Sequence, residues 1–303
     1  MIQQLRLILS VGLVLTLIPS LVSGQILVDE QFSGNEVDTN IFTFSGAGDE
    51  SFFGRTQLNS PDLPGPFDAP EVSNGTLKLR LQTFNPFGSA AGNLFLGDEI
   101  RTRQIFAPTA DAGLSYSIRS RIVNDSNGPL QGGLVGGMFT FGLDPNFPNP
   151  PERDEVDIEL LSNLPDSVLA NVFDDEGFNS GGDNGRLAPV SGLDITEFND
   201  YRLEMTTTSI RFFVNDQLFH EDLVNLAIDP QDFRLNINAP DASFAAAFNS
   251  SLQPTANPDE NEIFIFEVDS LVIRQLSAVP EPASGAILGL LGLGFLVRRR
   301  TAV

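Results

Sequence analysis

The chain has 303 residues, a formal net charge of −23 and no cysteine. So large a negative charge argues against binding to nucleic acid or to anionic membrane surfaces, because both would repel the protein. The absence of cysteine excludes a disulfide framework, so a large core or a bound metal ion has to stabilise the fold. We expect no organic cofactor.

The N-terminal segment predicts a secretory signal peptide. Arg6 precedes an apolar run from Leu7 to Val22, and small residues follow it. Val22 and Gly24 suit a cleavage site before Gln25, and the run is short for a membrane anchor. We therefore expect residues 1–24 to be a signal peptide and the protein to be exported.

Strand signals dominate the body of the chain, and helical periodicity is weak. Apolar and polar residues alternate in several short segments, which are separated by turn sequences such as Asn74-Gly75 and Asn215-Asp216. The clearest strands are expected at residues 76–81, 116–122, 201–205, 210–214, 233–238 and 263–268. This pattern predicts one all-β sandwich or jelly-roll domain over residues 25–277.

Residues 154–161 form the most informative of these segments. Three acids alternate with aliphatic residues, so on a strand Glu155, Asp157 and Glu159 would share one face. Paired carboxylates cleave glycosidic bonds, but an acidic row is also common on the solvated side of an antiparallel sheet. The Pro- and Asn-rich segment 144–153 before it is expected to be a loop, either a cleft wall or ordinary surface.

The C-terminus carries three features in a fixed order. Val279-Pro280-Glu281-Pro282 is followed by an apolar stretch from Ala283 to Val297 and then by Arg298, Arg299 and Arg300. This order resembles the PEP-CTERM sorting signal of exported bacterial proteins. The resemblance, over residues 278–303, implies an exosortase-type processing partner and a place in the cell envelope or outside the cell, with membrane contact only through this segment. The alternative is a simple C-terminal anchor.

The order of segments in the body resembles glycoside hydrolase family 16, the laminarinases, lichenases, agarases and carrageenases. The segments that carry the resemblance are Val28 to Gly34, Asn74 to Leu79, Glu99 to Arg103, Tyr116 to Arg121, Gly136 to Phe139, Glu155-Val156-Asp157-Ile158-Glu159, Tyr201 to Val214, Phe233 to Ala239 and Glu267-Val268-Asp269. The family implies a concanavalin A-like jelly-roll sandwich of two curved antiparallel sheets. It also implies an endo-acting, retaining hydrolase of β-linked polysaccharide such as β-glucan or galactan.

The resemblance also implies roles for individual residues. Glu155 would be the nucleophile, Glu159 the general acid and base, and Asp157 the residue that tunes both. Substrate contacts are expected from Phe139, Asn171, Phe173, Asn236 and Phe244. One structural calcium ion is implied at Glu30, Gly75 and Asp269.

The chain departs from the family pattern in its aromatic residues. It has no tryptophan, although family members commonly stack sugar rings on tryptophan, and it has 25 phenylalanines. His220 is the only histidine, and its place at a strand end predicts a surface residue. Two functions stay open: an exported glycosidase, or a non-hydrolytic carbohydrate-binding or extracellular-matrix protein on the same fold.

Overall fold

The computed structural model describes residues 24–46, 52–63, 67–87, 94–148, 151–177 and 183–277. The expected signal peptide, apart from Gly24, and the expected sorting segment 278–303 lie outside these residues. Within the described ranges, none of the helical structure is long and apolar enough to cross a membrane.

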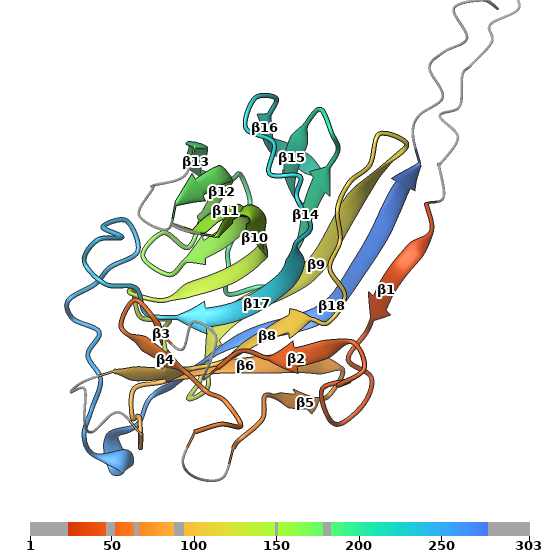
Figure 1. Cartoon of the computed structure of the whole chain (residues 1–303). Coiled ribbons are helices and arrows are strands. Elements are labelled where there is room, and N and C mark those ends of the chain that lie inside the picture. The colour runs from red at the N-terminus through yellow and green to blue at the C-terminus, as the bar shows by residue number, and fades with distance from the viewer. Residues whose placement is uncertain are drawn as a thin grey trace, which may run out of the picture.

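The larger of two sheets has eleven strands and holds both ends of the described chain (Figure 1). Its main path runs β16-β15-β14-β9-β18-β6-β7-β4-β3, with β1 paired to β18 and β5 paired to β6. The bounds are β1 (Ile26–Glu30), β3 (Phe52–Phe53), β4 (Thr56–Leu58), β5 (Glu71–Ser73), β6 (Thr76–Gln82), β7 (Phe95–Gly97), β9 (Ala112–Asn124), β14 (Asn199–Met205), β15 (Ile210–Val214), β16 (Gln217–Asp222) and β18 (Ile263–Ser277).

The smaller sheet has seven strands in the order β13-β12-β11-β10-β17-β8-β2. Its strands are β2 (Phe42–Phe44), β8 (Glu99–Thr102), β10 (Val135–Pro148), β11 (Pro151–Leu161), β12 (Ser167–Gly177), β13 (Asp183–Pro189) and β17 (Asp232–Asn238). A 3-10 turn, η2 (Pro258–Glu260), precedes β18. Figure 1 shows the two curved sheets packed as layers, which confirms the predicted all-β jelly-roll sandwich. Pairing is antiparallel except between β4 and β7, which run parallel.

The core lies between the two layers and follows from the alternation in the strands. Leu77, Leu79 and Leu81 point into it from the larger sheet, where Tyr116 and Phe266 are also buried. The smaller sheet contributes Met138, Val156, Ile158, Leu160, Phe233, Leu235 and Ile237. Because side chains alternate between faces, the residues between these apolar positions point away from the core. We call that side of the seven-stranded sheet the outer face.

The predicted turns form as hairpins. Asn74 and Gly75 join β5 to β6 with φ values of 54° and 76°, and Asn215 and Asp216 join β15 to β16 with φ values of 48° and 61°. Two successive left-handed residues match the twist of the flanking strands, which is why Asn, Asp and Gly occur there.

The expectation of a loop at residues 144–153 is wrong. Strand β10 continues to Pro148 and β11 begins at Pro151, with Pro148 paired to Pro151 across the hairpin. Proline is tolerated at strand ends, where its missing N–H breaks no interior pairing. Residues 144–148 therefore extend β10, and residues 151–153 begin β11, the strand that carries the acids.

Arg55 fixes the long connection between β17 and β18. Its guanidinium donates hydrogen bonds to the carbonyl oxygens of Pro240 (3.0 Å), Leu252 (2.9 Å) and Asn249 (3.4 Å). It also lies 5.1 Å from the ring centre of Phe95 and 4.9 Å from that of Phe248. One side chain thus ties this connection to the start of β4.

Replacing Arg55 with alanine should loosen this connection, because three carbonyl groups lose a charged donor. We expect a loss of about 2–4 kcal/mol in the free energy of unfolding. Hydrogen exchange of residues 240–252 should accelerate most. The variant Arg103→Ala serves as control, because Arg103 donates to one carbonyl, that of Thr39. Equal exchange of residues 240–252 in wild type and Arg55→Ala would contradict the proposed anchoring.

Candidate active site

Strand β11 carries the three predicted catalytic acids on the outer face. Glu155 lies opposite Phe141 of β10 and Phe173 of β12, while Asp157 lies opposite Phe139 and Asn171. Glu159 lies opposite Gly137 and Leu169. The intervening Val156, Ile158 and Leu160 are fully buried in the core. The acids and aliphatic residues that alternate in the sequence therefore point to opposite faces of β11.

The three acids are mostly removed from water and influence one another. Asp157 is only 6% exposed. Burial, followed by the charges of Glu155 and Glu159, raises its pKa well above the usual value. Burial and the charge of Glu155 raise the pKa of Glu159 to about 8. Glu159 therefore holds its proton at neutral pH. Burial favours the protonated form of Asp157, whose side chain hydrogen-bonds to that of Glu155.

Glu155 has a cationic partner that the sequence analysis did not identify. Nε of Arg153 donates to Oε2 of Glu155 at 2.5 Å, and both side chains are largely buried. The guanidinium carbon of Arg153 lies 4.1 Å from the ring centre of Phe173. An ion pair shielded from water favours the ionised carboxylate. Because Arg153 stands two residues before Glu155, the alternation could have placed it on the same face.

A β-bulge lies beside this ion pair. The pairing of β11 with β12 shifts between Arg153 and Glu155, where Asp174 and Asp175 stand opposite Asp154. Asp175 has a φ of 55°, and its N–H donates to Oδ1 of Asp154 at 3.0 Å. The other oxygen of Asp154 accepts from N–H of Asp229 at 2.8 Å. Asp154 thus holds the bulge and the segment before β17 in place.

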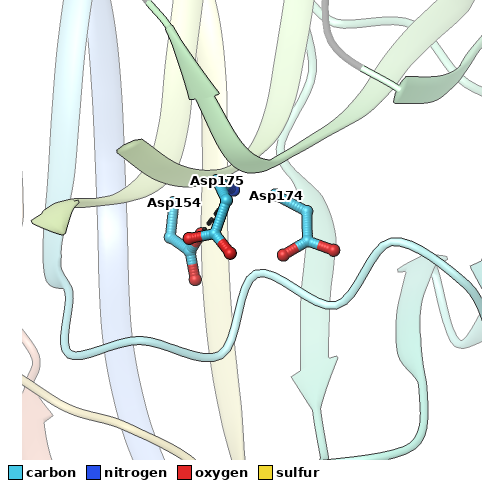
Figure 2. A group of neighbouring side chains, drawn as sticks. All are labelled: Asp154, Asp174 and Asp175. Atoms are coloured by element: carbon cyan, nitrogen blue, oxygen red, sulfur yellow. Dashed lines mark hydrogen bonds between the residues drawn. The ribbon is translucent and has the colours of Figure 1, made fainter. Parts of the chain in front are cut away.

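The carboxylates of Asp154, Asp174 and Asp175 gather at this bulge (Figure 2). One oxygen from each lies within 4.8 Å of the others, a spacing compatible with a cation. Asp154 already accepts two backbone hydrogen bonds, and Asp174 accepts one from Leu226 at 3.0 Å. These bonds account for the cluster as part of the bulge, and we assign no metal ion to it.

Most of the predicted substrate-binding residues surround the acids. Phe139 and Asn171 flank Asp157, and Phe173 flanks Glu155. Asn236 lies beside Gly137 and donates to Glu99 at 3.1 Å. Phe244 instead lies in the connection after β17, where it packs against a small apolar cluster of Val135, Leu161 and Ala247.

Arginine side chains cover two of the phenylalanine rings on the outer face. Besides Arg153 over Phe173, Arg234 lies 4.2 Å from the ring centre of Phe141. Arg234 also pairs with Asp232 at 2.6 Å and with Glu99 at 3.5 Å. None of Arg234, Asp232 and Glu99 is among the predicted site residues, although Glu99 belongs to a segment that carries the family resemblance. A ligand would meet guanidinium groups as well as aromatic rings here.

The residues predicted to bind calcium converge on the larger sheet. Strands β1 and β6 pair with the same side of β18, with Glu30 opposite Leu271 and Leu77 opposite Val268. Asp269 lies between these two pairs, at a register shift of β18. Gly75 is the second residue of the turn that leads into β6, two residues before Leu77. Asp269 also has a cationic neighbour, Arg119, at 3.5 Å.

His220 lies on β16 of the larger sheet. It is partly exposed, and its ring stacks on Phe212 with ring centres 5.6 Å apart. The acids of β11 belong to the smaller sheet, so His220 lies outside the candidate active site.

Two parts of the chain match known sequence families. Residues 129–234 match the model for glycosyl hydrolases family 16, and residues 278–300 match the PEP-CTERM protein-sorting motif. These matches confirm the two predicted resemblances, and the sorting motif indicates export to the cell envelope or beyond. No curated protein matches the chain by sequence.

Solved structures with the same fold include several glucanases. A prokaryotic β-1,3-1,4-glucanase (lichenase) from a mouse hindgut metagenome has 19% identity and a TM-score of 0.60, covering 82% of this chain and 98% of its own. The β-glucanase of Bacillus licheniformis has 16% identity and a TM-score of 0.59, covering 83% and 99%. The endo-β-1,3-glucanase of Pyrococcus furiosus has 16% identity and a TM-score of 0.60, covering 84% and 96%. The family match and this fold together support a glycoside hydrolase acting on O-glycosyl bonds.

The raised pKa of Glu159 predicts a specific dependence of stability on pH. A carboxyl that binds its proton more tightly when folded stabilises the protein fully below the unfolded pKa, near 4.5. This stability is lost as the pH rises through the folded pKa of about 8. Since each unit is worth about 1.4 kcal/mol, the effect should be on the order of a few kcal/mol. Wild type should therefore melt at a lower temperature at pH 9 than at pH 5.

The variant Glu159→Gln should flatten this dependence, because the amide has no proton to lose. The melting temperature of each variant is measured from pH 5 to pH 9. Glu204→Gln, on the larger sheet, is the control and should keep the wild-type slope. A wild-type slope in Glu159→Gln would show that Glu159 does not titrate as described.

Proposed function

We propose that the chain is an exported endo-glycosidase that hydrolyses β-linked polysaccharide by a retaining, double-displacement mechanism. The observation that supports it best is the outer face of β11, where an ion-paired Glu155 and a protonated Glu159 lie on either side of Asp157. A retaining enzyme needs one carboxylate as nucleophile and one carboxylic acid as proton donor. The two environments supply these different protonation states at neutral pH.

In this mechanism Glu155 attacks the anomeric carbon while the glycosidic bond breaks. Glu159 gives its proton to the departing oxygen, and a covalent glycosyl-enzyme forms. Water then attacks the same carbon, Glu159 takes the water proton, and Glu155 leaves as a carboxylate. Asp157, whose side chain hydrogen-bonds to that of Glu155, orients the nucleophile in both steps. The mechanism requires the carboxyl groups to be about 5–5.5 Å apart, so both glutamates must lean toward each other.

The proposed substrate is a β-glucan or a galactan. The structural neighbours act on β-1,3- and β-1,3-1,4-glucans, which favours a β-glucan for this chain as well. Phe139, Asn171, Phe173, Asn236 and Phe244 are proposed to contact it. We further propose that residues 25–277 form the hydrolase domain after removal of the signal peptide, residues 1–24, and that an exosortase-type enzyme processes residues 278–303.

A calcium ion is proposed to bind at Glu30, Gly75 and Asp269. The proposed ligands are the backbone carbonyls of Glu30 and Gly75 and the carboxylate of Asp269. The pairing of β1 and β6 with the same side of β18 supports this proposal, because it makes the three segments neighbours. Hard oxygen ligands suit calcium. When bound, the ion would tie the N-terminal strand to β18, and it has no part in the reaction.

Activity is tested by reducing-sugar release from β-1,3-glucan, β-1,3-1,4-glucan, agar and carrageenan. We expect wild type to cleave at least one of them, and Glu155→Gln and Glu159→Gln to lose about two to four orders of magnitude in rate. The anomeric configuration of the first product, followed by NMR, should match that of the substrate. Glu204→Gln is the control and should keep full activity.

Equal background release by wild type and both variants on every substrate would contradict the hydrolase. Binding of the same polysaccharides without cleavage would then identify the protein as a carbohydrate-binding or matrix protein. Inversion of the product would keep the enzyme but reject the covalent intermediate.

Calcium should raise the melting temperature of the protein relative to chelator, because an ion that binds only the folded state stabilises it. At a hundredfold excess over the dissociation constant, the gain is about 2.7 kcal/mol. Asp269→Asn should abolish the shift, and Asp174→Asn, in the cluster at the bulge, should preserve it. No shift in wild type, or an unchanged shift in Asp269→Asn, would reject this site.

A further inference from the structure

Arg153 occupies a position that links three features of the outer face. Its Nε donates to Oε2 of Glu155 at 2.5 Å, and its guanidinium lies over the ring of Phe173 at 4.1 Å. The Arg153 side chain is 8% exposed and that of Glu155 is 12% exposed. The pair is thus formed largely out of water, where an ion pair is much stronger than on an open surface.

The backbone prepares this geometry. Arg153 and Glu155 are two residues apart on one strand, so both point to the outer face, while Asp154 points the other way. The bulge opposite Asp154 displaces β12 by one residue and sets Phe173 directly across from Glu155. Bulges commonly re-aim side chains beside active sites. Here the bulge brings the ring of Phe173 under the guanidinium of Arg153.

We infer that Arg153 is a positioning residue that holds Glu155 ionised and fixes one of its oxygens, with Phe173 supporting the guanidinium. The inference rests on the proposed function, because it assigns Arg153 a role toward the nucleophile of that reaction. It also gives Phe173 a second role besides contact with the sugar. Arg153 does not touch the reacting carbon, so it acts through Glu155.

The charge balance around Glu155 explains why a cation is needed. Asp157 and Glu159 face it from its own strand, and Asp232 and Arg234 lie on β17, beyond Phe141 of β10. Arg234 already pairs with Asp232 and Glu99. Arg153 bonds directly to Glu155. Without it, Glu155 would compete more strongly with Asp157 and Glu159 for protons.

This role has a consequence for the two chemical steps. Formation of the glycosyl-enzyme removes the negative charge from Glu155, and its hydrolysis restores that charge. A fixed guanidinium favours the carboxylate, so it assists the second step, in which Glu155 is the leaving group. Loss of Arg153 should therefore slow hydrolysis of the intermediate and lower kcat and KM together.

The test compares Arg153→Gln with wild type in the full chain. Glutamate labelled with ¹³C at the side-chain carboxyl carbon reports ionisation, and the Glu155 signal is assigned by its loss in Glu155→Gln. We expect the titration midpoint of Glu155 to rise by about one pH unit or more in Arg153→Gln. The acidic limb of the kcat/KM profile should move up by the same amount, and kcat should fall about tenfold. Arg153→Lys, which keeps the charge, should restore most of the midpoint.

Arg186→Gln is the matched control, because Arg186 lies over Phe219 at 5.0 Å and belongs to β13, which β12 separates from β11. It should leave the Glu155 midpoint and the pH profile unchanged. An unchanged midpoint in a folded Arg153→Gln variant, or a midpoint in Arg153→Lys as high as that in Arg153→Gln, would overturn the inference. The NMR measurement needs no turnover, so a chain without activity would refute the proposed function while the midpoint still decides the role of Arg153.

Discussion

The period of two along β11 is the constraint on which the site depends. Val156, Ile158 and Leu160 must be buried between the sheets, so Glu155, Asp157 and Glu159 cannot avoid the outer face. A shift of one residue in register would place three carboxylates in the core. The hydrophobic drive that folds the sandwich therefore also fixes the spacing of the acids, and the chemistry uses an arrangement that packing already enforces.

Holding these acids in so little water costs stability, and the molecule limits that cost in two ways. Burial raises the pKa of both Asp157 and Glu159, which favours their uncharged forms and reduces the negative charge beside Glu155. The charge on Glu155 is matched by Arg153. The same difference in environment makes Glu159 a proton donor and Glu155 a carboxylate, although both are glutamates. Stability and the proposed catalysis thus both require an ionised Glu155 and a protonated Glu159.

The sequence predicted the fold and the three acids because both depend on local alternation and on the order of family segments. Strand β17, for example, begins one residue before the predicted range and ends with it at Asn238. The segment 144–153 was misjudged because prolines and asparagines resemble a loop when the partner strand is unknown. Arg153 and Arg234 were missed for a similar reason. Whether an arginine on a strand faces solvent or a buried carboxylate depends on cross-strand neighbours, which one sequence does not reveal.

The positions of Arg153 and Arg234 bear on how a site without tryptophan could bind a sugar. A bare phenylalanine ring offers a sugar less surface than tryptophan does. On this sheet, however, Phe173 and Phe141 lie beneath guanidinium groups, and each arginine is in turn bonded to a carboxylate. Each phenylalanine is therefore part of a layered unit of ring, guanidinium and carboxylate. Such a unit offers a sugar less area for stacking but more hydrogen-bond donors and fixed charge. Recognition here would therefore depend more on the hydroxyl groups of the sugar than on the apolar faces of its rings.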